Sequence, residues 1–98
     1  MWILRTDAEG DEALTFRLRV GGVKTIGRAP RADFVVDAAM VSRVHCRLTA
    51  GREQIDLQDL ESTNGTFVNG RRVERAALKE GDRLRVGRME LLVERRDR

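Results

Sequence analysis

Apolar side chains alternate with polar ones along much of this chain. The alternation is clearest over residues 14–20, 54–58 and 83–86. A spacing of two places side chains on one face of an extended strand, so each run predicts a half-buried β-strand. Shorter runs of the same kind span Trp2–Arg5, Lys24–Gly27, Phe34–Val36, Val44–Thr49, Thr66–Val68, Arg71–Val73 and Met89–Glu94.

Glycines separate these runs, as expected for turns between strands. Asn69-Gly70, between two short strand-like runs, predicts a hairpin with a type I′ turn. The only helical candidate, Val73–Leu78, is too short to be more than a turn. The pattern therefore predicts an all-β fold: an antiparallel β-sandwich of about ten to eleven short strands, with its loops gathered at the two ends of the sheets.

The length of 98 residues suits one domain with a substantial core. We predict a single domain over residues 1–94 and a charged C-terminal tail over 95–98, because the last residues are almost all charged. Charged residues make up 36% of the chain, above the usual quarter, so many of them should lie on exposed faces of the strands.

Charge and residue counts exclude several kinds of site. The basic residues, 17 arginines and two lysines, are interleaved with 16 acidic ones, so no basic block typical of nucleic-acid binding is present. Cys46 and His45 are the only residues of their types, which excludes an internal disulfide and a cysteine- or histidine-based metal site. Cys46 shares the parity of Val44 and Leu48 and is expected in the core. We expect no cofactor.

No apolar run approaches the roughly 18 residues that span a bilayer. Residues 1–11 lack the basic and apolar regions of a signal peptide. The sequence therefore predicts a cytoplasmic domain with no membrane partner.

Three polar segments lie at predicted strand ends. Gly27-Arg28 ends one strand, Ser42-Arg43 precedes another, and Thr63-Asn64-Gly65 links two more. Loops at one end of a sandwich can converge although they are distant in sequence. If these three converge, guanidinium, hydroxyl and amide groups meet in one place, and that set of donors suits a phosphate.

The order and spacing of these segments resemble the forkhead-associated (FHA) family of phosphothreonine-binding domains over about residues 3–94. The matching residues are Ile26-Gly27-Arg28, Val41-Ser42-Arg43-Val44-His45, Asp59, Ser62–Gly70 and Leu78–Gly87. Each piece alone is common, but the whole set in this order is specific to the family.

The resemblance implies a role for each of four phosphate-binding residues. Arg28 would bind phosphate oxygens, and Ser42 would donate its hydroxyl to the same group. Arg43 stands where the family has a polar or basic residue near the phosphate, and Thr63 would add a second hydroxyl or pack near the phosphothreonine methyl.

The resemblance also implies supporting roles around the phosphate. Asn64 would hold the peptide backbone, and Asn69 would brace or extend that contact from the hairpin, although a plain turn explains Asn69 equally well. Gly27, His45 and Gly65 would support the site structurally.

The resemblance therefore implies a non-catalytic module that binds phosphothreonine in a partner protein, within Ser/Thr kinase signalling. The partner would be a Ser/Thr kinase or its substrate. Met40, just before Val41-Ser42, could alter which residues flanking the phosphothreonine are preferred.

Three alternatives remain. A phosphorylation-independent interaction module could use the same fold through another surface. The basic isoelectric point, about 10.0, is the only argument for nucleic-acid binding. Ser42 and His45 could be drawn as a hydrolytic pair, but the chain lacks a Gly-x-Ser-x-Gly elbow and a second base.

Overall fold

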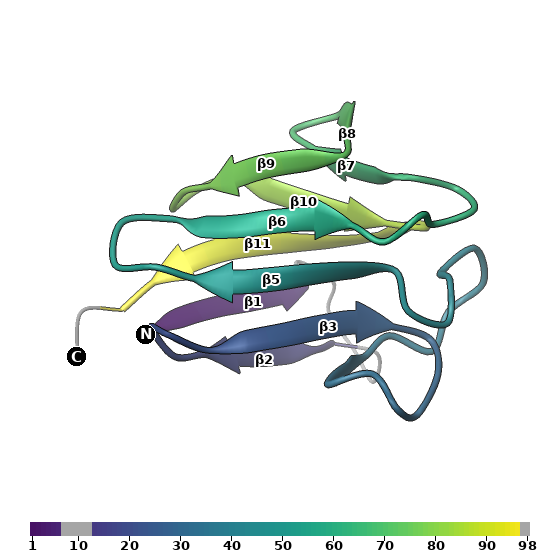
Figure 1. Cartoon of the computed structure of the whole chain (residues 1–98), viewed down its shortest axis with the longest axis horizontal. Helices are drawn as coiled ribbons and strands as arrows, with labels where there is room; N and C mark the ends of the chain where they lie inside the picture. Colours follow the sequence, from purple (N-terminus) through teal and green to yellow (C-terminus); the bar gives the residue numbers. More distant parts are fainter. Residues whose placement is uncertain (7–12, 97–98) are drawn as a thin grey trace.

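The computed structural model describes residues 1–6 and 13–96, which contain eleven β-strands, joined by turns and loops, and no helix (Figure 1). Residues 7–12, and residues 97–98 of the predicted tail, lie outside the described residues. The strands are β1 (Trp2–Thr6), β2 (Thr15–Leu18), β3 (Val23–Gly27), β4 (Phe34–Val35), β5 (Cys46–Ala50), β6 (Ile55–Asp59), β7 (Thr66–Val68), β8 (Arg71–Val73), β9 (Arg75–Leu78), β10 (Arg83–Val86) and β11 (Met89–Arg95).

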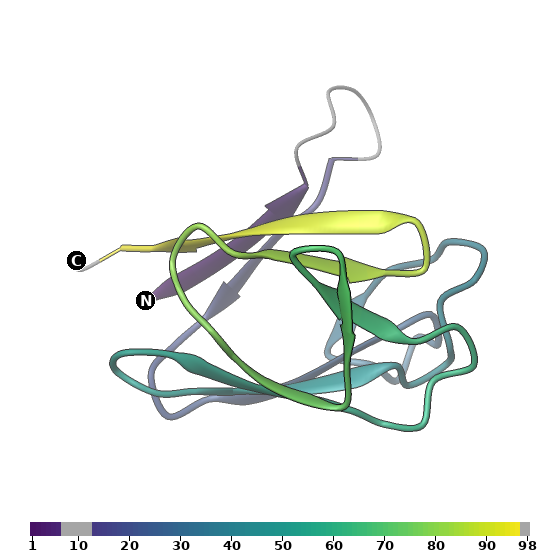
Figure 2. The same ribbon diagram turned by 90° about the horizontal axis from the view of Figure 1, so that it is seen from above.

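The strands form two sheets that pack face to face, as seen from above in Figure 2. One sheet has six strands in the order β2-β1-β11-β10-β7-β8, and the other has five in the order β4-β3-β5-β6-β9. Neighbouring strands are antiparallel except for the short β4, which pairs parallel to β3. The predicted all-β sandwich of ten to eleven strands is confirmed, with this one parallel pair as a local difference.

The core consists of the apolar residues that alternate along the strands. Leu84 and Val86 of one sheet are fully buried, and Ile55 and Leu57 of the other are at most 2% exposed. At one edge of the sandwich the rings of Phe16 (β2) and Phe34 (β4) stack with centroids 4.6 Å apart. Burial of these side chains between two layers is the main source of stability in such a fold.

The prediction failed at two places. Val20 was expected on the buried face, but β2 ends at Leu18 and Val20 is 47% exposed before the turn at Gly21. Residues 73–78 were expected to form a turn, whereas Arg75–Leu78 form strand β9, paired with β6. Pairing with a neighbouring strand overrides the weak local preference there.

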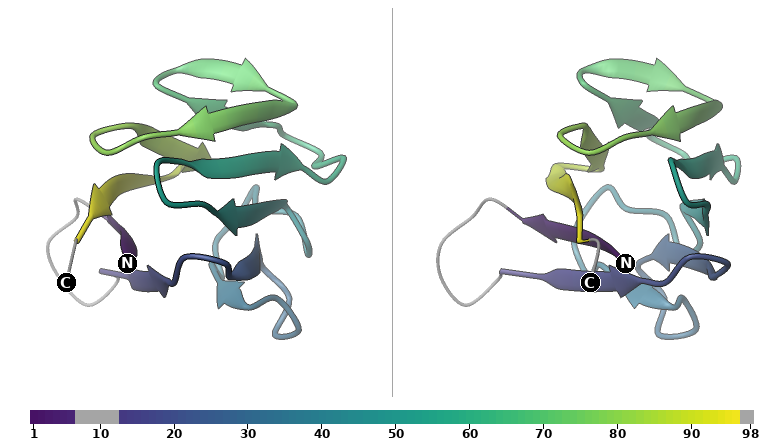
Figure 3. Two further views of the ribbon diagram at one scale, coloured as in Figure 1. Left: turned by 60° about the vertical axis from the view of Figure 1, so that its left-hand side comes forward. Right: turned by 90° about the vertical axis from the view of Figure 1, so that its left-hand side faces the viewer.

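The connections β3–β4, β4–β5 and β6–β7 lie together at the right-hand end of Figure 1. The N-terminus and the end of β11 lie at the opposite end, which faces the viewer in the right-hand panel of Figure 3. There the terminal ammonium of Met1 donates to the carbonyl of Arg96 (2.8 Å), which joins the start of β1 to the residue that follows β11.

The domain limit at residue 94 stays a prediction; β11 runs one residue further, to Arg95. No helix in the described part of the chain is long and apolar enough to cross a membrane.

Candidate functional site

One open groove at this end of the sandwich contains the three polar segments singled out in the sequence. Its volume is about 530 Å³. Arg28 reaches it from the end of β3, Ser42 and Arg43 from the β4–β5 connection, and Thr63 and Asn64 from the β6–β7 connection. The four predicted phosphate-binding residues and Asn64 therefore share one surface, with Ala39, Met40 and Val41 as the remaining walls.

Close backbone contact at Gly27 places Arg28 beside Ser42. The amide of Arg28 donates to the carbonyl of Ser42 (2.9 Å), and the amide of Ala29 donates to the carbonyl of Arg43 (3.1 Å). A Cβ at Gly27 would overlap the carbonyl oxygen of Arg43 and lie 2.9 Å from Cα of Val44. Only glycine fits this contact without a shift of the backbone.

The buried His45 joins the β4–β5 connection, which carries Ser42, to the β6–β7 connection, which carries Gly65. Its Nδ1 accepts a hydrogen bond from the amide of Ser42 (3.0 Å), and its Nε2 lies 2.8 Å from the carbonyl of Gly65. These partners assign the proton to Nε2, because Nδ1 must offer a lone pair. His45 is fully buried and bonded to the backbone of Ser42, which gives it a structural role.

The Ser42 hydroxyl is oriented by the neighbouring loop. The amide of Thr63 donates to Oγ of Ser42 (3.0 Å). A hydroxyl that accepts one hydrogen bond still has its own proton to donate. Ser42 therefore presents a positioned donor at the groove.

Two arginines line the groove. Nε of Arg28 donates to the carbonyl of Val41 (3.0 Å), which orients the guanidinium. Within residues 1–6 and 13–96, neither Nη group of Arg28 has a hydrogen-bond partner. Arg43 is exposed at the same groove. The positioned fork of Arg28 suits two oxygens of one anion.

Asn64 ties the β6–β7 connection to the β4–β5 connection. Its Nδ2 donates to the carbonyl of Met40 (3.1 Å). Met40 is 45% exposed and has a φ of 71°, so this wall of the groove has an unusual backbone conformation. Oδ1 of Asn64 and the second hydrogen of its amide remain for a ligand. A peptide backbone has one N–H donor and one C=O acceptor, so the Asn64 amide can pair with both.

The structure does not bring Asn69 to the groove. With Gly70 it forms the β7–β8 turn, where φ is 52° and 82°, as a type I′ turn requires. Its Nδ2 donates to Oδ1 of Asp82 (3.1 Å), and its Oδ1 accepts from the amide of Arg83 (2.9 Å). Asn69 therefore joins the hairpin to the start of β10, and the predicted peptide contact has no support in the geometry.

Asp59, for which the sequence predicted no role, organises the β6–β7 connection. Its Oδ1 accepts hydrogen bonds from the hydroxyls of Ser62 (2.6 Å) and Thr66 (2.7 Å). Oγ of Ser62 in turn accepts from the amide of Gly65 (3.0 Å). The spacing Asp-x-x-Ser, typical of side chains that bond to a nearby backbone, was the available signal.

These contacts also change the acidity of Asp59. Burial alone would raise the pKa of Asp59, but the hydrogen bonds from the hydroxyls of Ser62 and Thr66 and from the amide of Ser62 hold that pKa below its ordinary 3.8. Burial and the Asp59 charge also raise the pKa of the Cys46 thiol to about 12. Cys46 is therefore a core thiol, since the thiolate is the reactive form.

Asp59 should make stability depend on pH. Because its pKa is lowered in the folded state, its contribution is complete above the unfolded pKa near 3.8 and is lost as pH falls through the folded pKa. We expect Asp59→Asn to lower the free energy of unfolding by about 1–2 kcal/mol at pH 7, because charged hydrogen bonds become neutral ones. The difference in unfolding free energy between wild type and Asp59→Asn should shrink at the lowest pH values.

Urea unfolding of both proteins from pH 7 to pH 2 would measure this. Asp56→Asn is the matched control, because Asp56 is exposed on the opposite face of β6. A wild type and Asp59→Asn with parallel pH profiles would contradict the role of Asp59.

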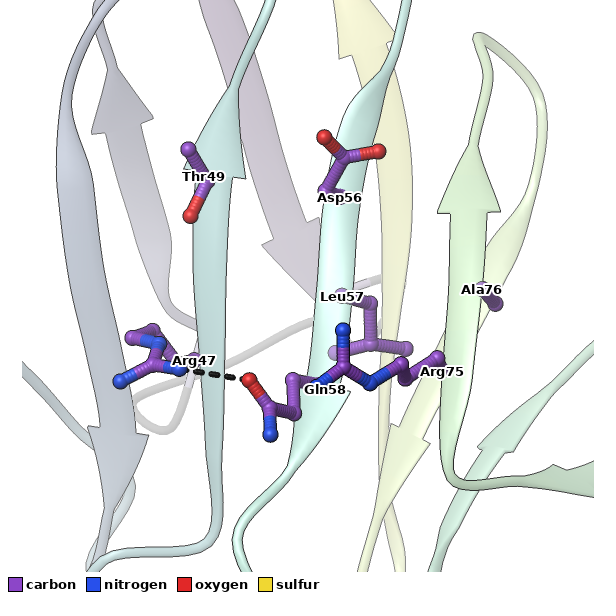
Figure 4. Close-up of a pocket in the computed structure, with 7 residues that line it drawn as sticks. All are labelled: Arg47, Thr49, Asp56, Leu57, Gln58, Arg75 and Ala76. Atoms are coloured by element: carbon purple, nitrogen blue, oxygen red, sulfur yellow. Dashed lines mark hydrogen bonds between the residues drawn. The ribbon is translucent and has the colours of Figure 1, made fainter.

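A separate depression of about 410 Å³ lies on the outer face of the five-stranded sheet (Figure 4). Arg47 of β5, Gln58 of β6 and Arg75 of β9 stand in a row across it, and Arg47 donates to Gln58. It shares no residue with the groove, so its arginines are suitable control positions. No group of His, Cys, Asp or Glu in the described part of the chain could hold a metal ion.

Comparison with known proteins gives consistent matches. The sequence profile of the FHA domain matches residues 24–87. The chain is 40% identical over 79 residues to an ABC transporter ATP-binding/permease protein of Mycobacterium tuberculosis, a match that covers 81% of the chain and 9% of the transporter. The chain thus spans only a small part of that relative.

Solved structures of the same fold are also similar. The FHA domain of the CT664 protein from Chlamydia trachomatis has a TM-score of 0.90 at 26% identity, with 97% of each chain covered. A structure from a study of phosphothreonine-dependent FHA domain interactions has a TM-score of 0.84 at 32% identity, with 99% of this chain and 98% of that chain covered.

The profile match spans well over half of the chain and includes every residue that lines the groove. The predicted resemblance is confirmed: this chain belongs to the FHA domain family.

Proposed function

We propose that this domain binds phosphothreonine in partner proteins through the groove. The observation that best supports the proposal is that Arg28, Ser42, Arg43, Thr63 and Asn64 line one groove although they come from three separate connections. A similar structure, described above, belongs to a study of phosphothreonine-dependent interactions.

The groove offers complementary groups for each part of the ligand. A phosphorylated side chain carries about −1.5 to −2 charges at pH 7 and three strong acceptor oxygens. The Nη groups of Arg28, the guanidinium of Arg43 and the hydroxyls of Ser42 and Thr63 would donate to those oxygens. Asn64 would pair with the main chain of an extended peptide, which positions the ligand without reading its sequence.

The supporting contacts keep these groups in place before the ligand arrives. His45 joins Ser42 to Gly65, and the backbone pairing beside Gly27 joins Arg28 to Ser42. A preorganised site loses less conformational entropy on binding, which increases affinity.

We infer that the domain acts as a binding module and not as an enzyme. His45, the only histidine, is fully buried and bonds to the backbone amide of Ser42 instead of its hydroxyl. A serine nucleophile needs a base within reach of its hydroxyl. The expected partner is a Ser/Thr kinase or its phosphorylated substrate in the cytoplasm, because such kinases produce phosphothreonine.

An oriented phosphopeptide library, followed by calorimetry on one selected sequence, would test the function. We expect binding of the phosphothreonine peptide, no measurable binding of its unphosphorylated form, and weaker binding of the phosphoserine form. The lost methyl should cost on the order of 0.8 kcal/mol, the value of one buried CH₂ group. A natural partner whose affinity survives phosphatase treatment would instead support a phosphorylation-independent module.

A further inference from the structure

A second depression continues from the phosphate groove along the β3–β4 connection. Its volume is about 470 Å³. Arg28 and Arg43 line both hollows, so they form the border between them. The remaining walls of the second hollow are Ala29, Pro30, Val35 and Asp37. A peptide held at the phosphate groove can therefore place a neighbouring side chain in this second hollow.

Asp37 is the one acidic residue among the described residues that line the second hollow. Its side chain is exposed, and within the described residues it has neither an ion pair nor a hydrogen bond. Its backbone is nevertheless held, because Val36 donates to the carbonyl of Gly27 (2.8 Å) and Ala38 donates to the carbonyl of Val36 (3.0 Å). The hollow thus presents a carboxylate without a direct partner on a positioned segment.

Apolar surface surrounds this carboxylate. Val35 is 36% exposed and lines the second hollow together with Pro30. Lysine and arginine side chains place an aliphatic stem on apolar surface while their charged head stays polar. Val35 and Asp37 therefore match the two parts of a long basic side chain.

We propose that Asp37 and Val35 form a subsite that selects a lysine or arginine near the phosphothreonine. The inference rests on the proposed function, because the two positive charges of Arg28 and Arg43 separate the groove from Asp37. Without a phosphate these arginines repel a cationic side chain; once a phosphate neutralises them, the attraction of Asp37 dominates. The ligand that best matches this surface therefore carries a doubly negative phosphate with a positively charged side chain beside it.

Matched peptides would test the subsite. Each would carry one phosphothreonine in an alanine background, with arginine, alanine or glutamate placed in turn at every position within four residues on either side. We expect one position at which arginine binds about 2- to 5-fold more tightly than alanine, the range of an exposed ion pair. Glutamate at that position should bind more weakly than alanine.

Asp37→Asn should remove this preference and leave the affinity for the all-alanine phosphopeptide within about 2-fold of wild type. Asp37→Lys should reverse the preference in favour of glutamate. Asp56→Asn, on the outer sheet face shown in Figure 4, is the matched control and should keep the arginine preference. Unchanged thermal unfolding of each variant would show that the fold is intact.

The outcomes separate the two proposals. Phosphopeptide binding with no arginine preference, or a preference that persists in Asp37→Asn, overturns the subsite and leaves the function standing. If Asp37→Asn increases the affinity for all phosphopeptides equally, the subsite is also overturned, because Asp37 would then only repel the phosphate of every peptide. A wild type that binds no phosphopeptide overturns the proposed function and the subsite with it.

Discussion

Replacement of Arg28 by alanine is expected to weaken binding of a phosphothreonine peptide by about 2–5 kcal/mol, the usual cost of removing one partner of a desolvated charge pair. The phosphate would remain in the groove with its oxygens poorly paired, since Arg43 and the two hydroxyls cannot replace a bidentate guanidinium. Calorimetric titration of wild type and Arg28→Ala with one peptide measures the difference.

Arg75→Ala is the matched control for Arg28→Ala. Arg75 is an exposed arginine on the outer face of β9, away from the groove (Figure 4). The same loss of one positive charge there should change the affinity only slightly, and less at high salt, because distant charges are screened. Equal losses in both variants would mean that net charge attracts the peptide, and equal affinity of Arg28→Ala and wild type would contradict the site.

Arg28→Lys sharpens the comparison because it keeps the charge and removes the fork. Nε of Arg28 is held by the carbonyl of Val41, and the two Nη groups have no hydrogen-bond partner among the described residues, so both are available to a ligand. A lysine has no second planar donor and cannot keep both contacts. We therefore expect Arg28→Lys to recover only part of the affinity lost in Arg28→Ala.

The sequence predicted the fold wherever a strand has one buried face. Leu84 and Val86 alternate with arginines, and both are fully buried in β10. The prediction failed at Val20, because the alternation of apolar and polar residues does not show where a strand ends. It also failed over residues 73–78, because two adjacent alanines carry little β preference and the strand exists through its pairing with β6.

The candidate site was predictable only in part. The polar residues that line the groove were predicted because their types and order match a family motif. Asn69 shows the limit of that method, because a type I′ turn and a ligand contact both favour asparagine at that position. Asp59 was missed as an organiser because its role depends on hydroxyls of Ser62 and Thr66 that the fold brings to one carboxylate oxygen.

The second large effect is expected for Gly27→Ala, which should destabilise the fold and the site together. The new methyl group would lie 2.8 Å from the carbonyl carbon of Arg43 and overlap its oxygen. The neighbouring atoms belong to the backbone, so no side chain can rotate away. The two segments must separate, which strains or breaks the hydrogen bonds from Arg28 to Ser42 and from Ala29 to Arg43.

The loss of two backbone hydrogen bonds, at about 0.5–1.5 kcal/mol each, and the overlap itself, at about 1–3 kcal/mol, should together cost about 2–6 kcal/mol of unfolding free energy. That is a large part of the 5–15 kcal/mol typical of a domain. Chemical denaturation measures the loss. Gly51→Ala is the control: it lies in the β5–β6 turn, and its Cβ would approach only one backbone atom, the carbonyl oxygen of Gln54, at 3.0 Å.

The affinity of the folded fraction of Gly27→Ala for the phosphopeptide separates the effect on the fold from the effect on the site. If the close contact serves only the fold, the protein that remains folded will bind the phosphopeptide as wild type does. If the contact also sets the spacing between Arg28 and Ser42, affinity falls even after correction for the unfolded fraction, because the two donors no longer reach the same phosphate. We expect the second result, since the strained hydrogen bonds are the ones that hold these two residues side by side.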